Sequence, residues 1–387
     1  MTELIDDLVR WRRHLHQHPE VSFHENETAA YVEAELRAMG VEHIERPTPT
    51  SVAALIEGTA PAAGPVRTAA LRADLDALAV TEAPGLACRS VNEGVSHVCG
   101  HDAHMAILLG VAKTLLARRS EFAGRVKLIF QHAEELLPGG AAELVKAGVL
   151  EGVDAAIGLH VWNDRIGRIS ICDERVATTA SDMAWIEITG RGTHGSMPHE
   201  GIDPILVGTE IVGALHTIVS RSIPPGSFAV VSPTIFQGGE VINVIPQTAK
   251  IGLNIRTKDE AVRGRIKERI YAIAESIAAA HGAAVEIKWT RGYDAIVQDE
   301  GMIERAVRVA RENFAPEFVQ TRGGWTASED FSAYANVVPS VYLFLGAGNA
   351  EEGYPYQNHH PAFRIDEGCL LPGVKMEVAL ALDFLRG

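Results

Sequence analysis

The chain has little of several features that mark particular protein classes. It carries only four cysteines among 387 residues, and it has no apolar run of the roughly 18–20 residues that a membrane span requires. Sparse, irregularly spaced cysteines exclude the disulfide framework of a small secreted protein, so we expect reduced thiols or metal ligands. The opening segment MTELIDDLVRWRRHLHQHPE lacks the apolar core of a signal peptide. We therefore expect a cytoplasmic protein.

Positive charge is also in deficit. The chain has 35 Lys and Arg residues against 50 Asp and Glu residues, which gives a formal net charge of −15. Such a surface repels phosphate backbones and anionic lipids. Nucleic acid and membranes are therefore excluded as expected partners.

Several catalytic motifs are missing as well. We find no GxGxxG after an expected strand and no GxxxxGK[ST], GxSxG or HExxH. Nucleotide-binding and serine-hydrolase functions therefore have no residues to support them.

The composition that remains is that of a folded, two-domain protein. Apolar residues make up 47% and charged residues 22%, and 36 Gly and 18 Pro are spread along the chain. Such a chain can bury a core, and its length exceeds one ordinary domain of roughly 100–200 residues.

The first part of the chain alternates expected strands with expected helices. After a helical pair at 4–15 and 27–39, helices are expected at 101–119 and 139–147. The expected strands are 51–58, 68–73, 125–131 and 153–159. Strands that alternate with helices favour an α/β fold with a mostly parallel sheet.

From residue 181 the pattern changes to βαββαβ, which is typical of a compact ferredoxin-like domain. A helix at 301–313, a strand at 338–346 and a last helix from 368 then follow. We therefore expect residues 181–291 to be an inserted domain, and residues 1–180 and 292–387 to form the main, catalytic domain. On the expected strand 248–257, Arg256 falls on the exposed face.

Polar side chains follow the expected strands of the first domain. Asp74 and Asp76 come after the second strand, Glu134 and Glu135 after the third, and His160 after the fourth. In open α/β sheets, ligands bind outside the carboxyl ends of the strands. We therefore expect these residues to face one site.

The segment SHVCGHDAHM is the densest candidate for a metal site. Cys99 and His101 would present two ligands on one side of an extended segment. The segment is too short to surround a tetrahedral ion, so other ligands must come from elsewhere. The alternative is that Cys99 is a core thiol and the histidines begin a helix.

Other segments offer the remaining ligands. In FQHAEE, one carboxylate can bind an ion while its neighbour serves as a general base. His160 of GLHVW and one of the pair His359 and His360 add imidazoles. This mixture of thiolate, imidazole and carboxylate suits zinc, manganese, nickel or cobalt and suffices for two ions, so two-metal hydrolysis is the leading hypothesis.

The histidines of the first helix are interpreted differently. His14, His16 and His18 are two residues apart, so they do not share a helix face. We interpret them as a solvated helix end rather than as metal ligands.

These residues together resemble a known family, the dinuclear-metal metallopeptidases of the aminoacylase and carboxypeptidase type. The likeness is to the amidohydrolase subfamily, which includes hippurate hydrolases, N-acyl-amino-acid amidohydrolases and plant auxin-conjugate hydrolases. It extends over nearly the whole chain. The matching segments are 12–25, RADLDAL (72–78), 97–110, 130–135, 158–162, GRGTHGSMPH (190–199), GGEVINVIP (238–246), SEDF (328–331) and HHPAF (359–363).

The resemblance implies two divalent metal ions in the catalytic domain and an inserted lid domain that also dimerises. It implies that Cys99 bridges the ions, with His101 and His160 on one. Glu135 and His359 would hold the other, His359 being chosen over His360 because it stands two residues before the proline.

Further roles are implied by the same resemblance. Glu134 would be the general base, which takes a proton from the attacking water and returns it to the leaving amine. His194 would stabilise the oxyanion in the partner subunit's site with help from Asn243, and Arg256 would grip a substrate carboxylate. Asp74 is expected to be an orienting residue, for His101, because Arg72 occupies the position of the wider family's metal-binding histidine.

The expected function is a dimeric amidohydrolase that cleaves N-acyl-amino acids, or similar small amides with a free carboxylate, into an acid and an amine. A dipeptidase or other exopeptidase on the same scaffold is the alternative. A silent binding module and a purely structural scaffold stay open as other classes. His132 stands where the subfamily commonly has proline, and its role is open.

Overall fold

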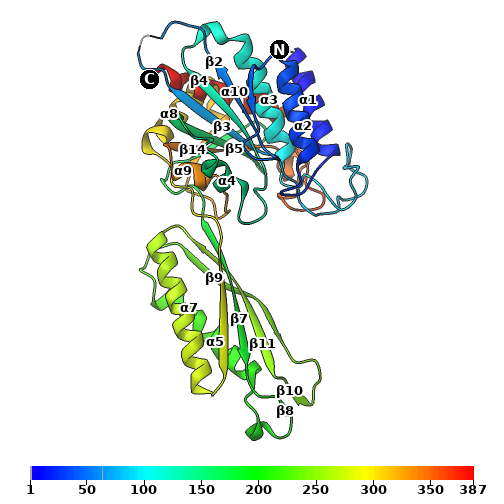
Figure 1. The fold of residues 1–387 in the computed structure, drawn as a ribbon, viewed down its shortest axis with the longest axis vertical. Coiled ribbons are helices and arrows are strands. Elements are labelled where there is room, and N and C mark those ends of the chain that lie inside the picture. The colour runs from blue at the N-terminus through cyan, green and yellow to red at the C-terminus, as the bar shows by residue number, and fades with distance from the viewer. Residues whose placement is uncertain (1, 63) are drawn as a thin grey trace. The chain divides into compact units, whose positions relative to one another are not determined.

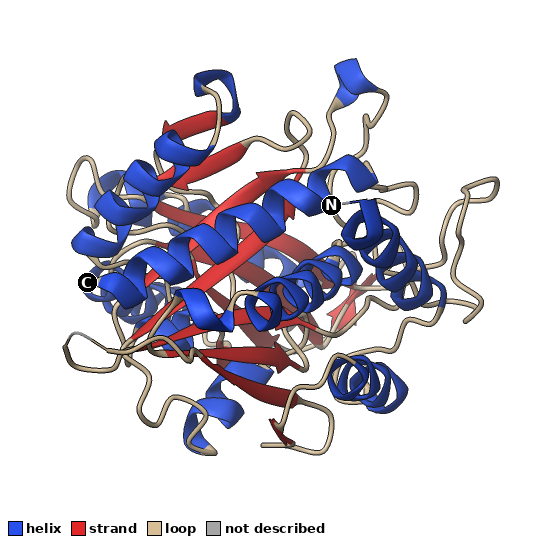
Figure 2. Ribbon diagram, turned by 90° about the horizontal axis from the view of Figure 1, so that it is seen from above, coloured by secondary structure: helices blue, strands red, loops and turns tan. Residues whose placement is uncertain are grey.

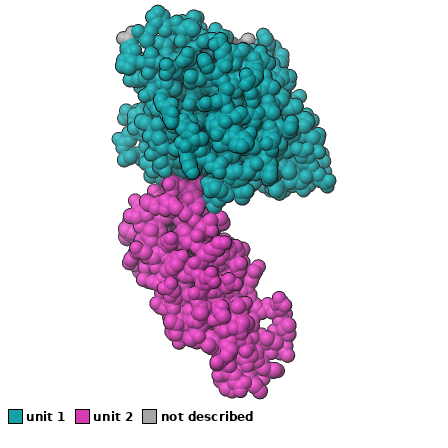
Figure 3. Space-filling view, in the orientation of Figure 1, with its two compact units in different colours: residues 1–177, 296–324, 330–387 teal, residues 178–295, 325–329 magenta. Residues whose placement is uncertain are grey.

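The computed structural model describes residues 2–62 and 64–387. The chain divides into two compact units (Figure 3). Unit 1 consists of residues 1–177, 296–324 and 330–387, and unit 2 of residues 178–295 and 325–329. The segment 325–329 groups with unit 2, whereas the sequence pattern had placed it in the catalytic domain.

Unit 1 is built on an eight-stranded sheet with the order β1-β2-β4-β3-β5-β14-β6-β13 (Figure 1). The strands are β1 His43–Glu45, β2 Val52–Glu57, β3 Thr68–Asp74, β4 Arg125–Gln131, β5 Ala155–Trp162, β6 Ile169–Cys172, β13 Val319–Arg322 and β14 Ser340–Gly346. All residues of β3 and β14 are buried, as expected for central strands covered on both faces.

The sheet is mixed, and four of its seven strand pairings are parallel, as the expectation of a mostly parallel sheet requires. β3 pairs in parallel with β4 and β5, and β14 in parallel with β5. However, β2 runs antiparallel to β4, and β6 antiparallel to β14. The connection 163–168 and the described residues of the connection 58–67 contain no helix. Without a crossover helix the chain simply returns, so the next strand runs in the opposite direction.

Helices lie against the strands of this sheet (Figure 2). They are α1 Thr2–Gln17, α2 Asn26–Ala38, α3 His101–Ala117, α4 Gly140–Lys146, α8 Glu300–Asn313, α9 Ser332–Ala335 and α10 Leu370–Arg386. Helix α3 is buried along most of its length and packs against α1, α10 and β3. Its residues Met105, Leu108 and Leu109 belong to the core of unit 1. The start of α3 is thereby fixed beside the ends of β3 and β5.

Unit 2 contains a four-stranded antiparallel sheet with the order β12-β7-β11-β9. Its elements are β7 Ala180–Thr189, α5 Pro204–Leu215, α6 Thr217–Arg221, β9 Ala229–Gly238, β11 Thr248–Thr257, α7 Glu260–Ala280 and β12 Ala284–Arg291. The βαββαβ order is thus present, and its first helical segment is divided into α5 and α6 at His216. A two-stranded ribbon, β8 Thr193–His194 with β10 Val244–Ile245, completes the unit.

The core of unit 2 lies between its sheet and its helices. Ile186 of β7 and Ile251 of β11 are buried with Ile211 of α5 and Ile266 of α7. The alternate residues of β11, such as Arg256, are half-buried, so only one face of this sheet is fully covered.

Short 3₁₀ turns connect several elements: Arg119–Glu121, Pro198–Glu200, Pro316–Phe318, Ala350–Glu352 and Glu367–Cys369. Within the described part of the chain, no helix is long and apolar enough to cross a membrane.

Candidate metal centre

The strand ends of unit 1 bring the predicted ligands together. Asp74 is the last residue of β3, and Glu134 and Glu135 follow the end of β4 by a few residues. His160 lies inside β5, not beyond it as expected, because this strand continues to Trp162. Since β3 is parallel to both β4 and β5, their carboxyl ends lie at the same edge of the sheet.

A glycine turn, not an extended segment, places Cys99 and His101. Gly100 caps α3 with a φ of 94°, in the left-handed region that glycine tolerates. A Cβ atom there would lie 2.4 Å from Cγ2 of Val161. The turn therefore needs glycine for both its conformation and the closeness of β5, and it directs Cys99 and His101 into one site.

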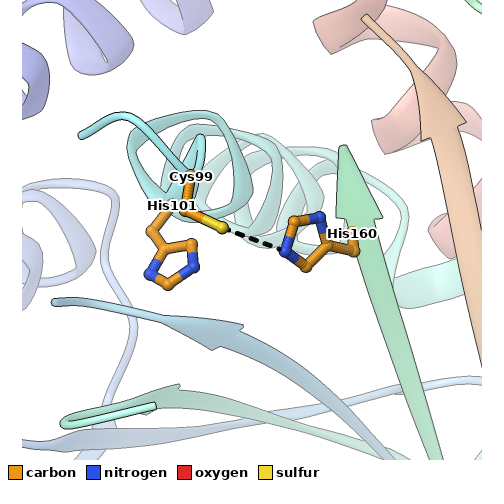
Figure 4. Close-up of side chains that lie close together, drawn as sticks. All are labelled: Cys99, His101 and His160. Atoms are coloured by element: carbon orange, nitrogen blue, oxygen red, sulfur yellow. Dashed lines mark hydrogen bonds between the residues drawn. The ribbon is translucent and has the colours of Figure 1, made fainter. Parts of the chain in front are cut away.

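Cys99 is shared by two groups of potential metal ligands. The first group contains Cys99, His101 and His160, and the second Cys99, Glu135 and His359. The Cys99 Sγ atom lies 3.4 Å from Nε2 of His160, with the His101 ring beside it (Figure 4). It also lies 3.3 Å from Nε2 of His359.

These distances suit ions of the size of zinc. Two ligand atoms on a tetrahedral zinc ion, one sulfur and one nitrogen, lie about 3.5 Å apart, given the usual bond lengths. In the second group, Nε2 of His359 lies 3.2 Å from Oε1 of Glu135. Each group therefore has the spacing of a coordination shell around one ion.

The structure also distinguishes His359 from its neighbour. The backbone N–H of His359 donates to the carbonyl of Val98, and the Asn358 side chain donates to the carbonyl of Cys99. The ring of His360 instead stacks on Tyr356 and accepts a hydrogen bond from the N–H of Ala362. Only His359 is turned toward Cys99.

The backbone of Asp76 holds the His101 ring by a hydrogen bond, and Asp74 lies near the same ring. The Nδ1 atom of His101 lies 2.8 Å from the backbone carbonyl of Asp76, so Nε2 is left to face the other ligands. Asp74 Oδ2 is 3.6 Å from that Nε2 atom. The hydrogen bond of Asp74, at 2.6 Å, is with His104 Nδ1.

His104 extends this support to the strand that carries His160. Its Nε2 atom accepts a hydrogen bond of 2.8 Å from the N–H of Val161. Nδ1 must therefore carry the proton in the neutral ring and donate it to Asp74. Arg72 donates to Asp74 from the other side, so a buried set of polar residues fixes β3, α3 and β5 around the site.

Two buried ligand atoms have no hydrogen-bond partner among the described residues, namely Nε2 of His101 and Oε1 of Glu135. Unpaired buried polar atoms are costly, so they mark places where something else binds. Both belong to the ligand groups above. The residues present therefore fit two divalent ions, with sulfur and nitrogen donors in the first group and sulfur, nitrogen and oxygen donors in the second.

The electrostatics of the site point the same way. Burial raises the pKa of the Cys99 thiol well above its ordinary value, and Glu135 and Glu134 add to the shift. Burial opposes a charge on His101, but Asp74 and Asp76 raise its pKa to about 10. A nearby cation reverses both effects, because metal ligands must be deprotonated.

Glu134 lies beside these ligands without belonging to the two groups that share Cys99. It is buried, with 7% of its surface exposed. One of its oxygens lies within 4.8 Å of ligand atoms of His101 and Glu135. It is thus placed beside both ligand groups.

The structure corrects the interpretation of one histidine, His16, and shows the surroundings of another, His132, whose role the sequence left open. His16 is buried, with 3% of its surface exposed, and contacts Asp102 and Glu82, so it is not part of a solvated helix end. His132 is also buried, but its nitrogens lie near Thr48 and Glu143. It does not point at the carboxylates that follow it.

The remaining predicted site residues lie in unit 2. His194 and Asn243 are close, since the N–H of Gly195 donates to the carbonyl of Asn243 at 2.7 Å. Arg256 lies on β11 and donates to the Asn254 side chain.

The sequence analysis missed the buried supports Asp76, His104 and Asn358 as partners of the ligands. The motif HVCGHDAHM placed His104 one helical turn after His101, which was the available signal.

Comparisons with known proteins agree with this geometry. Residues 70–383 match the model of peptidase family M20/M25/M40. The chain is 43% identical over 301 residues to an N-acyl-L-amino acid amidohydrolase of Geobacillus stearothermophilus, covering 77% of this chain and 80% of the relative. It is 36% identical to thermostable carboxypeptidase 1 of Saccharolobus solfataricus, covering 99% of this chain and 96% of the relative.

A solved structure is similar along the whole length. The YXEP protein of Bacillus subtilis, described as a dinuclear metal-binding peptidase of the M20 family, superposes with a TM-score of 0.83 at 32% identity. The match covers 100% of this chain and 99% of that protein. The resemblance found in the sequence is thus confirmed, and the chain belongs to peptidase family M20/M25/M40.

Proposed function

We propose that this protein is an amidohydrolase that uses two divalent metal ions to cleave N-acyl-amino acids into a carboxylic acid and a free amino acid. One observation carries the proposal: Cys99 belongs to two adjacent groups of ligand atoms, and Glu134 lies beside both. A binding module would not need a buried carboxylate at that position. The amidohydrolase relative supports the same reaction.

The proposed ligands are those that surround Cys99. Cys99, His101 and His160 would hold one ion, and Cys99, Glu135 and His359 would hold the other. The donor set accepts zinc, manganese, nickel or cobalt. When bound, the ions polarise the scissile carbonyl and lower the pKa of the attacking water.

Glu134 is the proposed general base. Its carboxylate takes a proton from water as the oxygen attacks the amide carbon. It then delivers that proton to the nitrogen as the C–N bond breaks, so that the amine leaves neutral.

His194 is the proposed oxyanion donor, contributed to the partner's site, with Asn243 assisting. The N–H and the hydroxyl of Ser196 lie 3.1 and 2.8 Å from Nδ1 of His194. Since a backbone N–H can only donate, Nδ1 is the acceptor, and the proton of the neutral ring is on Nε2. His194 can therefore donate one hydrogen bond to a developing negative charge.

Arg256 is the proposed anchor for the substrate carboxylate. It is half-buried, and the ion pairs among the described residues do not include it. A guanidinium group can bind a carboxylate through two parallel hydrogen bonds. An N-acyl-amino acid supplies that carboxylate, whereas the corresponding amino-acid amide does not.

A homodimer formed through unit 2 is part of the proposal. Unit 2 exposes apolar side chains on β9 and near β10, among them Phe236, Val241 and Ile242. Exposed apolar surface of this kind is typical of interaction sites. Mixing Glu134→Gln with His194→Ala protein tests the exchange of His194. In an equal mixture half of the dimers are mixed, and each has one complete site if His194 acts in the partner's site. The mixture then regains about a quarter of the wild-type rate, and it stays inactive if His194 acts in its own site.

The decisive experiment is amine release from a panel of amides, followed by mass spectrometry. Protein loaded with zinc, manganese or cobalt is offered N-acetyl-, N-benzoyl- and N-fatty-acyl-amino acids, matched amino-acid amides and dipeptides. Hydrolysis of one acyl class by wild type, with none by Glu134→Gln, supports the proposal. No turnover by metal-loaded protein contradicts it and favours a binding module, and failure to take up metal favours a structural scaffold.

An exopeptidase is the second candidate, because the carboxypeptidase relative aligns over 99% of this chain. The panel separates the two by the effect of a free α-amino group. If the protein hydrolyses dipeptides faster than every N-acyl-amino acid, the exopeptidase proposal replaces the amidohydrolase proposal.

The cytoplasm is the proposed location, since the Cys99 thiol must stay reduced to bind metal. Cell fractionation with an antibody tests this part.

A further inference from the structure

The motif RRHLHQHPEVSFHE has no role in the proposed reaction, yet its second half lies against the candidate site. Val21 forms an isolated parallel bridge with Ala77, and the carbonyl of Glu20 accepts a hydrogen bond of 2.8 Å from the N–H of Ala77. Ala77 directly follows Asp76, whose carbonyl orients His101. We call residues 20–25 the brace segment.

Glu25, at the end of the brace segment, holds the residue before Glu134. Its side chain is completely buried, and Oε1 accepts a hydrogen bond of 2.7 Å from the backbone N–H of Ala133. Ala133 is itself buried and has a φ of 50°, in the left-handed region that alanine rarely adopts. A conformation of this kind persists only where its surroundings enforce it.

Ser22, in the same segment, supports the residue after Glu134. Its hydroxyl donates to Oδ2 of Asp76 at 2.6 Å. The same carboxylate oxygen accepts a hydrogen bond of 2.9 Å from the backbone N–H of Glu135. The backbone N–H groups of Ala133 and Glu135, on either side of Glu134, are thus each held by a buried carboxylate. One carboxylate, that of Glu25, belongs to the brace segment, and the other, that of Asp76, is contacted by it.

We propose that Glu25 is a positioning residue that fixes the backbone of the Glu134–Glu135 loop and thereby aims both carboxylates. The inference rests on the proposed function, in which Glu134 moves the proton and Glu135 holds an ion. Without an acceptor the buried N–H of Ala133 is unpaired, and the loop relaxes from its left-handed conformation. Glu134 then moves away from the reacting atoms, and small displacements of this kind lower rates steeply.

Two substitutions separate positioning from charge. Glu25→Gln keeps an acceptor oxygen of the same reach, whereas Glu25→Ala removes it. We expect Glu25→Ala to lower kcat about 10–100-fold with little change in KM. Glu25→Gln should stay within about fivefold of wild type, because the amide oxygen still accepts the N–H of Ala133.

Glu377 provides the matched control. It is another buried glutamate of unit 1, on α10, and none of its described contacts is with the loop. Glu377→Ala and Glu377→Gln should change stability but leave kcat within about twofold of wild type. Equal losses of kcat in Glu25→Ala and Glu377→Ala would show that Glu25 acts only through general stability and would overturn the inference.

A second measurement does not depend on turnover. Metal-free protein is titrated with cobalt, and binding is followed by its visible absorption. Because Glu135 is aimed by the same loop, Glu25→Ala should bind the weaker of the two ions about tenfold less tightly, and Glu25→Gln should not. Cobalt affinities unchanged in Glu25→Ala would count against the inference.

The two measurements distinguish this inference from the proposed function. If wild type hydrolyses no amide, the proposed function fails, and the cobalt affinities alone decide whether Glu25 positions the loop. If Glu25→Ala does not fold, Ser22→Ala takes its place, since it loosens Asp76 and should weaken cobalt binding in the same direction. Ser22→Ala with wild-type cobalt affinity and wild-type kcat would overturn the inference.

Discussion

The Nδ1 atom of His16 lies 2.8 Å from Oδ2 of Asp102, the residue next to His101 in the chain. The other ring nitrogen of His16 lies 2.8 Å from Oε1 of Glu82, and Nε of Arg12 lies 2.9 Å from the same Asp102 oxygen. All four side chains are buried. Helix α1 is therefore joined to the start of α3, from which His101 projects, by a buried ionic network.

Removing one member of this network should destabilise the protein strongly. His16→Ala leaves the buried carboxylates of Asp102 and Glu82 with fewer partners, so we expect the free energy of unfolding to fall by about 3–5 kcal/mol. His18→Ala, at an exposed position of the same segment, should change it by less than about 0.5 kcal/mol. Urea denaturation measures both variants, and equal effects would contradict this account of the network.

The same histidine should make stability depend on pH. Burial opposes protonation of His16, but the Asp102 and Glu82 carboxylates together outweigh it, and the net effect raises the pKa of His16 in the folded state. The stabilisation is complete below the unfolded value of about 6.5 and is lost as pH rises through the folded value. The difference in unfolding free energy between wild type and His16→Ala should therefore shrink from pH 6 upward. If this difference in unfolding free energy grew with pH instead, the pKa of His16 would be lowered in the folded state and the prediction would be wrong.

Glu377 should be a site where a substitution stabilises the protein. Burial in α10 raises the pKa of this carboxyl from 4.5 to about 8. Its ionisation therefore favours the unfolded state increasingly as pH rises from 4.5 to about 8. Glu377→Gln should gain about 1–3 kcal/mol of stability at pH 7 relative to its effect at pH 4, measured by thermal unfolding at both values. If the effect of Glu377→Gln on stability were the same at both pH values, the carboxyl of Glu377 would not have a raised pKa in the folded protein.

Gly100 should tolerate no side chain. Gly100→Ala adds a Cβ atom 2.4 Å from Val161 to a residue with a φ of 94°. Gly152 also has a positive φ, of 68°, but nothing lies within 4 Å of its Cβ position. Gly152→Ala should therefore cost only the backbone strain, about 1 kcal/mol, whereas Gly100→Ala should cost clearly more and weaken metal binding. Equal losses in chemical denaturation would show that strain alone matters.

Metal content should follow the two ligand groups. Treatment with a chelator should abolish amide hydrolysis, and added metal should restore it. By elemental analysis, Cys99→Ala should lose both ions, His359→Ala should keep about one, and His360→Ala should keep about two, because His360 is turned toward Tyr356. Loss of an ion in His360→Ala but not in His359→Ala would reverse the assignment.

The regular elements could be predicted because their residues repeat with clear periods. Strand 248–257 was predicted at its observed bounds, since Ile251, Leu253 and Ile255 alternate with polar residues. The strands Ile169–Cys172 and Val319–Arg322 were missed, because four residues are too few to show a period. The antiparallel direction of β2 could not be predicted, because the pattern shows that a strand exists and not which neighbour it pairs with.

The candidate ligands could be recognised because their chemistry marks them: a thiol, imidazoles and carboxylates lie at or near the ends of buried elements. The buried residues that support these ligands could not be predicted. His16 was interpreted as solvated since its spacing from His14 and His18 shows which face it occupies, but not that Asp102 lies under that face. Glu25 contacts Ala133 far along the chain, and no local pattern indicates such a pairing.

The place of β14 in the sheet has a consequence for biosynthesis. This strand, Ser340–Gly346, lies between β5 and β6, although both precede it in the chain. As the ribosome extends the polypeptide from its N-terminus, β5 keeps one open hydrogen-bonding edge until residue 346 has emerged. His359 emerges later still. The strand that carries His160 therefore waits for nearly the entire chain, and a nascent chain halted before β14 would expose an apolar edge for chaperones to protect.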